Sequence, residues 1–185
     1  MSFSLYRAAL LGALAVPLPA CAAPFTLSSP DLGPRATLRE AQVFKGFGCK
    51  GANLSPALQW RGVPAGARSL ALTVYDPDAP TGSGWWHWQV VNLPPTLDGL
   101  AADAGAVGGA ALPDGAVQGP SDFGARGYGG ACPPQGDRPH RYIFTLYALK
   151  VAALDVPADA SAALIGFMVR ANAIGQATFT ATYGR

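Results

Sequence analysis

Three segments that are rich in aromatic and β-branched residues do most to limit the fold of this chain. The first, 69–75, is apolar at both alternating positions and stops at Asp76-Pro77, which is typical of a strand covered on both faces. The second, 85–93, stops at Pro94-Pro95, and the third, 141–149, has the same character. We expect the first to be a central strand and the second to pair close to it.

The remaining segments predict few helices. Residues 98–120 are dominated by Gly and Ala without a sustained period, which favours a long surface loop. Residues 158–174 predict one helix, with Asp159 or Ser161 as its N-cap. Its apolar residues at helical spacing are Leu164, Phe167, Met168 and Ala171. Residues 178–183 alternate as a final strand or extended tail. Short connections and one late helix predict a mainly β protein, a β-sandwich with helical additions.

Composition agrees with a compact, turn-rich fold. Of the 185 residues, 50% are hydrophobic and 13% are charged, with 23 Gly and 17 Pro. This length allows one domain with a substantial core and is short for two. The net charge is only +2 and the Lys and Arg residues are scattered, so we expect no nucleic-acid partner.

The first residues have the layout of a secretory signal. Arg7 precedes an apolar run over 8–16, and small residues and proline follow. We expect residues 1–22 to be a signal peptide, and 23–185 to be a single domain that is periplasmic or secreted. The run is shorter than the roughly 18 apolar residues of a transmembrane span. Cys21 offers an alternative, because residues 18–21 also resemble a lipoprotein box in which this cysteine is lipidated.

Removal of the leader leaves two cysteines in the domain, Cys49 and Cys132. An even pair in an oxidising compartment favours a disulfide. Two buried free thiols remain the alternative, because sequence does not show how close the two residues lie.

Polar residues gather where the expected strands begin or end. Asp76 and Asp78 follow the first strand on either side of Pro77. His140 and Tyr142 lie two residues apart, a spacing that puts imidazole and phenol on one face of a strand. The other histidine, His87, lies in the second strand. Pairing of the strands predicts that these groups converge at one rim of the sheet.

Such a group of side chains suits an anionic ligand. Imidazole and phenol donate hydrogen bonds to phosphate oxygens, and a nearby carboxylate orients the imidazole. Trp85 or Trp86 is expected to supply an aromatic wall, and backbone N–H groups of residues 127–130 are expected to offset the repulsion from the carboxylates. Taken singly, each feature also fits an ordinary turn, a packed core or a structural histidine.

A metal-dependent hydrolase is the alternative, with two His and two Asp as ligands. The sequence contains no H-E-x-x-H motif and no G-x-S-x-G motif, which argues against catalysis. We therefore expect a binding protein without a cofactor or metal, and not an enzyme.

Three stretches of the chain together resemble the phosphatidylethanolamine-binding proteins, particularly the bacterial Raf-kinase-inhibitor-like branch. They are GCKGANLSPALQW (48–60), VYDPDAPTGSGWWHWQVVNLP (74–94) and DFGARGYGGACPPQGDRPHRYIFTLYAL (122–149). The resemblance implies an antiparallel β-sandwich of Greek-key type, with a C-terminal helix, short peripheral helices and a small preformed anion pocket.

By matched position, the resemblance implies the following pocket residues: Asp76, Pro77, Asp78, His87, Gly130, Pro134, His140 and Tyr142. Trp86 stands where many relatives carry a second histidine, so we expect it to narrow the pocket or change its polarity. Cys132 stands where many relatives carry glycine, and a bridge to Cys49 would stiffen the loop beside the site. The implied ligands are phosphate, phospholipid head groups or phosphorylated molecules. Some relatives inhibit kinases or proteases, so a protein target is the second class of partner.

Overall fold

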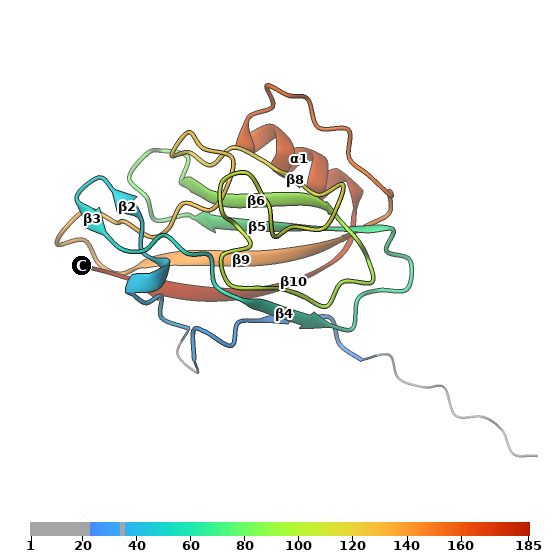
Figure 1. The fold of residues 1–185 in the computed structure, drawn as a ribbon, viewed down its shortest axis with the longest axis horizontal. Helices are drawn as coiled ribbons and strands as arrows, with labels where there is room; N and C mark the ends of the chain where they lie inside the picture. The colour runs from blue at the N-terminus through green and yellow to red at the C-terminus, as the bar shows by residue number, and fades with distance from the viewer. Residues whose placement is uncertain (1–22, 34–35) are drawn as a thin grey trace, which may run out of the picture.

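The computed structural model describes residues 23–33 and 36–185 (Figure 1). The expected signal peptide, residues 1–22 with Cys21, lies outside the described residues. The described chain is mainly β, with one α-helix near the C-terminal end of the sequence, as predicted.

The larger sheet has five strands in the order β10-β9-β5-β6-β8, and every neighbouring pair is antiparallel. The strands are β5 (Ser69–Asp76), β6 (Trp85–Leu93), β8 (Val117–Gln118), β9 (His140–Leu149) and β10 (Ala173–Tyr183). The three segments with the strongest strand pattern form β5, β6 and β9, with β5 between the other two. The prediction of a central first strand is therefore confirmed.

A smaller sheet covers one face of the larger one. Its strands are β1 (Thr26–Ser28), β4 (Leu58–Arg61) and β7 (Gly99–Leu100), in the order β1-β4-β7. Leu58 and Trp60 of this sheet belong to the same buried cluster as Leu72, Val74 and Phe144 of the larger sheet. The two sheets thus enclose the main apolar core, as expected of a β-sandwich.

Two small elements flank the sandwich. A hairpin pairs β2 (Lys45–Gly46) with β3 (Cys49–Lys50). A single 3-10 turn, η1 (Glu40–Gln42), precedes this hairpin. Figure 1 shows the hairpin at the same end of the molecule as the start of β9. These elements matter because the hairpin reaches the site described below.

The helix α1 (Ala162–Asn172) exists as predicted, but it buries a different face. Ser161 is the N-cap, and its side-chain oxygen accepts a hydrogen bond from Leu164 N at 3.2 Å. Ile165 and Val169 are fully buried, whereas Leu164 and Phe167 are 40% and 69% exposed. The expected apolar face was wrong because the short residues Ala162 and Gly166 also turn toward the sheet. They let the helix pack closely on the outer face of the larger sheet, which makes a third layer.

The chain passes directly from α1 into β10, so the last strand begins five residues before the predicted segment 178–183. Residues 98–120 lie mostly at the surface in turns, as expected, but they also contain short strands and buried residues. They supply β7 and β8, and the buried Gly105 N donates to Ser55 Oγ at 2.9 Å. Gln118 Oε1 accepts from Trp88 Nε1 at 2.7 Å. Hydrogen bonds to side chains hold this segment in place. Its sequence therefore needs no periodic pattern of apolar residues.

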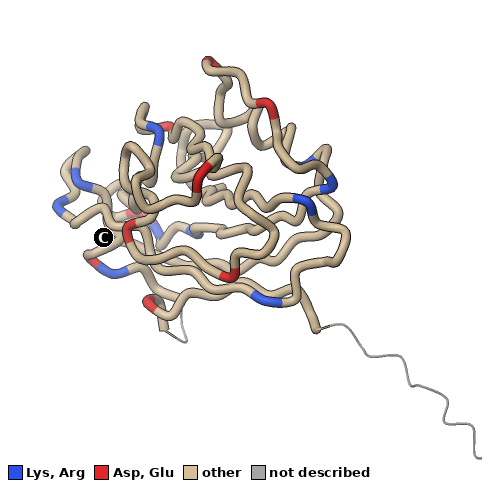
Figure 2. Tube along the Cα trace, turned by 45° about the vertical axis from the view of Figure 1, so that its right-hand side comes forward, with Lys and Arg blue, Asp and Glu red and all other residues tan. Residues whose placement is uncertain are grey.

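Charged residues lie scattered over the described chain without a basic stripe (Figure 2). This distribution agrees with the small net charge of +2. Among the described residues, no helix combines the length and apolar character needed to cross a bilayer.

Candidate functional site

A cavity of about 160 Å³ lies where β5 ends and β6 and β9 begin. Antiparallel pairing brings these three strand ends together, because each neighbour of β5 starts where β5 stops. Six residues expected from the sequence line the cavity: Asp76, Trp85, His87, Pro134, His140 and Tyr142. Segments that lie far apart in the sequence therefore meet at one site.

His87 owes its position to a β-bulge in β6. Tyr75 pairs with Trp86 and Val74 pairs with Trp88, so His87 has no partner on β5. The extra residue lets both His87 and Trp88 turn to the inner side of the sheet. His87 Nδ1 lies 2.7 Å from the Gly129 carbonyl oxygen. Because a carbonyl only accepts, Nδ1 carries the hydrogen and donates it.

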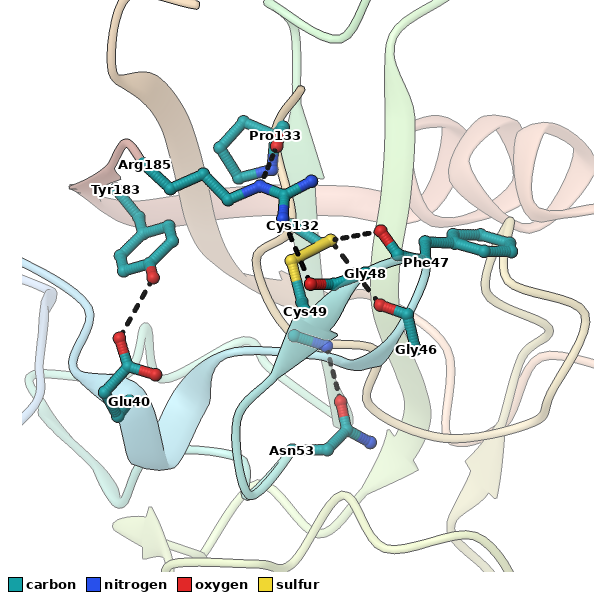
Figure 3. The surroundings of a disulfide bond; sticks show 11 residues. Glu40, Gly46, Phe47, Gly48, Cys49, Asn53, Cys132, Pro133, Tyr183 and Arg185 are labelled. Atoms are coloured by element: carbon teal, nitrogen blue, oxygen red, sulfur yellow. Dashed lines mark hydrogen bonds between the residues drawn. A yellow bond between two sulfur atoms is a disulfide. The ribbon is translucent and has the colours of Figure 1, made fainter. Parts of the chain in front are cut away.

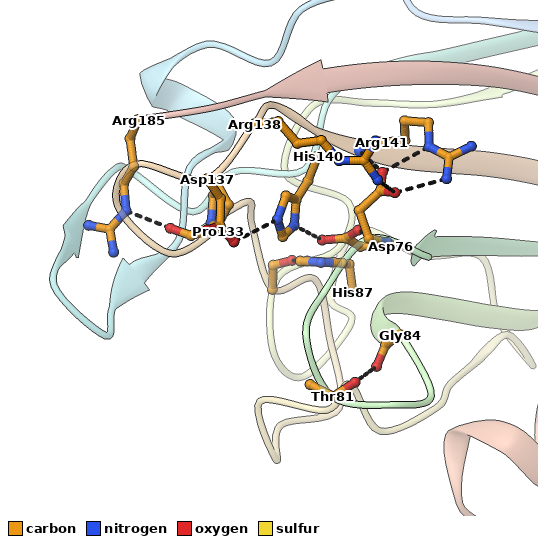
Figure 4. A network of polar contacts seen from close by, with 12 residues as sticks. Asp76, Thr81, Gly84, His87, Pro133, Asp137, Arg138, His140, Arg141 and Arg185 are labelled. Atoms are coloured by element: carbon orange, nitrogen blue, oxygen red, sulfur yellow. Dashed lines mark hydrogen bonds and ion pairs between the residues drawn. The ribbon is translucent and has the colours of Figure 1, made fainter.

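A polar network links Asp76 to His140 across the cavity wall (Figure 4). Asp76 Oδ2 lies 2.8 Å from His140 Nδ1, and Asp76 Oδ1 accepts from Asp78 N at 2.8 Å. The second imidazole nitrogen, His140 Nε2, lies 3.4 Å from Asp137 Oδ2. Both side chains of the central pair are nearly inaccessible, at 3% and 4% exposure. This network fixes the orientation of the His140 ring and of the Asp76 carboxylate.

Asp78 serves the turn and does not line the cavity. Its two carboxylate oxygens accept from Arg141 Nε and Nη2 at 2.8 and 2.9 Å, and Arg138 Nη2 donates at 2.9 Å. The hydrogen bond from Arg141 lowers the pKa of Asp78 to about 2. The expectation that both aspartates point into one pocket was wrong for Asp78, because these arginines hold its side chain. Pro77 also lies outside the cavity lining.

Three buried polar atoms of cavity-lining residues have no hydrogen-bond partner within residues 23–33 and 36–185. They are Trp85 Nε1, His87 Nε2 and Tyr142 Oη. Burial and the nearby Asp76 raise the pKa of Tyr142, so its phenol keeps its hydrogen. Burial lowers the pKa of His87. Buried polar groups are nearly always paired in folded proteins, so three unpaired ones around one cavity indicate a ligand site.

Three N–H groups of the glycine-rich loop are bonded within the protein and are not offered to a ligand, contrary to expectation. Tyr128 N donates to Gly105 O at 2.7 Å, Gly129 N to His87 O at 2.8 Å, and Gly130 N to Asn53 Oδ1 at 2.8 Å. Gly130 lies behind the cavity wall: a Cβ built on it would come 2.2 Å from the Gln42 carbonyl oxygen. The loop is therefore a support for His87 and not a cradle for the anion.

Trp86 faces away from the cavity, and Trp85 takes the expected place. Trp86 packs against Tyr75, with ring centroids 4.6 Å apart, on the outer face of the larger sheet. Trp85 and His87 lie two residues apart and line the cavity together. The expectation that Trp86 shapes the pocket was wrong, and the i, i+2 relation of Trp85 to His87 was the available signal.

Two phenylalanines that sequence patterns did not single out form the rim. Phe47, at the tip of the β2–β3 hairpin, and Phe123 both line the cavity. Their ring centroids are 5.7 Å apart, and Phe44 stacks on Phe123 at 3.9 Å. These residues lie in loops without a periodic pattern, so no strand argument could place them. Phe47 is 71% exposed, so the mouth of the cavity is apolar.

A disulfide joins the hairpin to the cavity wall (Figure 3). Cys49 and Cys132 are bonded, with Cα atoms 6.0 Å apart, and Cys132 lines the cavity. Arg185 adds a second link, because its Nε donates to Pro133 O at 2.7 Å and its Nη1 donates to Gly48 O at 3.2 Å. The predicted pairing is present, and it holds the rim beside the site.

Larger hollows lie elsewhere but lack comparable chemistry. A groove of about 590 Å³ runs over the smaller sheet, and a hollow of about 340 Å³ lies beside Trp86 and Arg170. None of the unpartnered buried atoms belongs to a residue that lines either hollow within the described chain. We therefore assign the site to the smaller cavity.

The geometry gives no support to the metal-dependent hydrolase. Across residues 23–33 and 36–185, no group of three His, Cys, Asp or Glu is arranged to hold a metal ion. Asp78 is paired with Arg141, and His87 and His140 are each bonded through Nδ1 to a protein oxygen.

The fold and cavity define a β-sandwich with one small polar pocket at the end of its larger sheet. A family model described as phosphatidylethanolamine-binding protein matches residues 28–184. The chain belongs to the phosphatidylethanolamine-binding protein family.

Individual relatives of known sequence or structure support this family membership. YbcL of Escherichia coli (strain K12) is 54% identical over 162 residues, covering 88% of each chain. The crystal structure of E. coli YbcL, described as a new member of the mammalian PEBP family, has a TM-score of 0.85 at 53% identity and covers 88% of this chain and 99% of that one. LppC of Mycobacterium tuberculosis, which is named a lipoprotein, is 39% identical over 167 residues, or 90% of this chain and 75% of the relative.

Proposed function

We propose that this protein binds a small phosphate-bearing ligand, free or as a head group, in the cavity at the end of β5. One observation carries the proposal: Trp85 Nε1, His87 Nε2 and Tyr142 Oη are buried around the same cavity, without a partner among the described residues. Leaving a buried polar group unpaired costs about 1 to 3 kcal/mol. A bound anion would recover much of this cost.

The size and lining of the cavity suit a head group. Its volume of about 160 Å³ is well below the roughly 300 to 1,000 Å³ of pockets for drug-sized ligands. Phe47 and Phe123 make one side of its rim apolar. A low local dielectric strengthens each hydrogen bond to an anion inside. The remainder of a larger ligand would extend past the exposed Phe47.

We propose binding without chemical conversion, and without a resident metal or cofactor. His140 and Asp76 are bonded to each other, so their arrangement supports a positioning role in the wall. Incubation with O-phosphoethanolamine, followed by phosphorus NMR, tests this part. The ester is expected to remain intact, and release of inorganic phosphate above the rate in buffer would show that the protein is an enzyme.

We also propose export across the inner membrane. The pattern of residues 1–22, the Cys49–Cys132 disulfide and the similarity to the lipoprotein-named LppC support it. Mass spectrometry of the protein after expression of the full chain in a bacterium tests it. A mature chain that begins at Ala23 is expected. A lipidated Cys21 would show the lipoprotein route, and an uncleaved chain in the cytoplasm would contradict export.

Isothermal titration calorimetry with inorganic phosphate and O-phosphoethanolamine tests the binding function. Tyr142→Phe removes one donor to the anion, and a hydrogen bond to a charged group contributes about 1.5 to 3 kcal/mol. Affinity should therefore fall about tenfold or more. Tyr147→Phe is the matched control, because Tyr147 lies in the same strand and packs on the other face of the sheet. It should bind like the wild type.

Two results would contradict the proposal. The first is the absence of heat of binding with both ligands. The second is equal loss of affinity in the two tyrosine variants, because Tyr147 does not line the cavity.

A further inference from the structure

The two nitrogens of His87 have different roles. Nδ1 donates to the Gly129 carbonyl oxygen at 2.7 Å. A neutral imidazole has one donor and one acceptor nitrogen, so Nε2 then presents a lone pair. Full burial lowers the pKa of His87 and favours this neutral form. Nε2 therefore accepts a hydrogen bond in the cavity.

The two other unpartnered groups have the opposite requirement. Trp85 Nε1 is a donor only. Tyr142 keeps its hydrogen, because burial raises its pKa, and it can direct that hydrogen to an acceptor. All three atoms are buried and, within the described chain, have no protein partner. A ligand that satisfies them must accept two hydrogen bonds and donate one.

We propose that this cavity selects a monoanionic phosphate group that still carries at least one hydrogen: inorganic dihydrogenphosphate or a singly protonated phosphomonoester. The P–O–H group donates to His87 Nε2, while other oxygens accept from Trp85 and Tyr142. The inference rests on the proposed function and specifies its ligand. His87 is the residue that determines specificity.

Two similar anions fail this requirement. Sulfate has nearly the same size and shape, but it carries no hydrogen at neutral pH. In a phosphodiester the two oxygens that are not esterified share one negative charge, so it likewise offers no hydrogen. In either case His87 Nε2 faces an oxygen that only accepts, so two lone pairs oppose each other in a buried site. The intact head group of a phospholipid is a phosphodiester and falls in the second class.

The charge of the cavity wall favours the same ligand. The Asp76 carboxylate lines the cavity, so each further negative charge on the ligand is repelled. Phosphomonoesters lose their second proton near pH 6, so a singly protonated form is accessible at neutral pH. Asp76 therefore disfavours the dianion, and His87 favours the retained hydrogen.

Calorimetric titrations of the full chain at neutral pH test the inference with four probes: inorganic phosphate, sulfate, monomethyl phosphate and dimethyl phosphate. The first and third are expected to bind at least about tenfold more tightly than sulfate and dimethyl phosphate. If sulfate binds as tightly as inorganic phosphate, or dimethyl phosphate as tightly as monomethyl phosphate, the inference is wrong although the anion site stands. If none of the four binds, the proposed function itself fails.

The variant His87→Gln tests the residue. Its side-chain amide can turn an N–H toward the ligand, so the ratio of phosphate to sulfate affinity is expected to fall to within about twofold. Tyr142→Phe is the control: its hydroxyl donates to either anion, so its loss should weaken both and leave the ratio unchanged. If His87 were only structural, its replacement would weaken the binding of phosphate and of sulfate alike. An unchanged ratio of phosphate to sulfate affinity in His87→Gln would therefore overturn the proposal. If that variant fails to fold, the four titrations of the wild type still test whether the cavity prefers a phosphate that carries a hydrogen.

Discussion

Asp76 and His140 lie 64 residues apart in the sequence, yet Asp76 Oδ2 is 2.8 Å from His140 Nδ1 and both side chains are buried. The contact ties the end of β5 to the start of β9. It sets the orientation of one cavity wall before any ligand arrives.

His140→Ala should destabilise the protein by about 3 kcal/mol, because it leaves the buried Asp76 carboxylate without this donor. Asp76→Ala should cost a similar amount. The double variant should lose at least about 1 kcal/mol less than the sum of the two. Urea denaturation measures all three. Asp137→Ala is the control: Asp137 is 43% exposed and lies 3.4 Å from His140 Nε2, so it should cost less than about 1 kcal/mol. Strict additivity of the double variant would contradict the coupling.

Asp78 predicts a loss of stability in acid. The pKa of Asp78 is lowered from 3.8 to about 2, mainly by the hydrogen bond from Arg141. The carboxylate therefore contributes its full stabilisation above the ordinary pKa, and this contribution is lost as pH falls from 3.8 toward 2. Asp78→Asn should be less stable than the wild type near neutral pH, and the difference should shrink over this acid range. Thermal melts at several pH values measure it, with the exposed Asp155→Asn as the control. A constant difference at all pH values would exclude this ion pair as the cause.

The disulfide should contribute a large part of the stability. It closes a loop with a sequence separation of 83 residues, for which the chain-entropy model gives about 4.5 kcal/mol. The double variant Cys49→Ser, Cys132→Ser should lose about this amount in urea denaturation. The wild type in reductant should approach the variant, whose own stability should not respond to reductant. A wild type that does not respond to complete reduction would contradict this role.

Two glycines in the turn between β5 and β6 differ in the space around them. Both have positive φ, +77° at Gly82 and +69° at Gly84. A Cβ at Gly82 meets nothing within 4 Å, whereas one at Gly84 would lie 2.1 Å from Tyr75 Oη. Gly82→Ala should cost about 1 kcal/mol from backbone strain alone. Gly84→Ala should cost about 3 kcal/mol, since overlap adds to that strain. Thermal melts measure the stability of both variants. An equal loss of stability would show that the overlap with Tyr75 does not add to the backbone strain.

The convergence of the site could be predicted from sequence, because it depends on strand ends. Asp76 follows the central strand, and His140 begins another. Antiparallel neighbours must bring these ends together, so the motif spacing and the family resemblance agree with the structure.

Features that depend on tertiary hydrogen bonds could not be predicted. The bulge at His87 puts the neighbouring residues His87 and Trp88 on the same side of the sheet, which strict alternation would not predict. Arg141 diverts Asp78 from the site, and Asn53 occupies the N–H of Gly130. Each outcome depends on a partner far away in the sequence, and no local pattern records it.

A crystal structure of the protein with inorganic phosphate is the most direct measurement of the central claim. The phosphate should occupy the cavity, with oxygens within hydrogen-bond distance of Trp85 Nε1, His87 Nε2 and Tyr142 Oη. A saturated complex with phosphate bound elsewhere, and with these three atoms still lacking a ligand, would contradict the account.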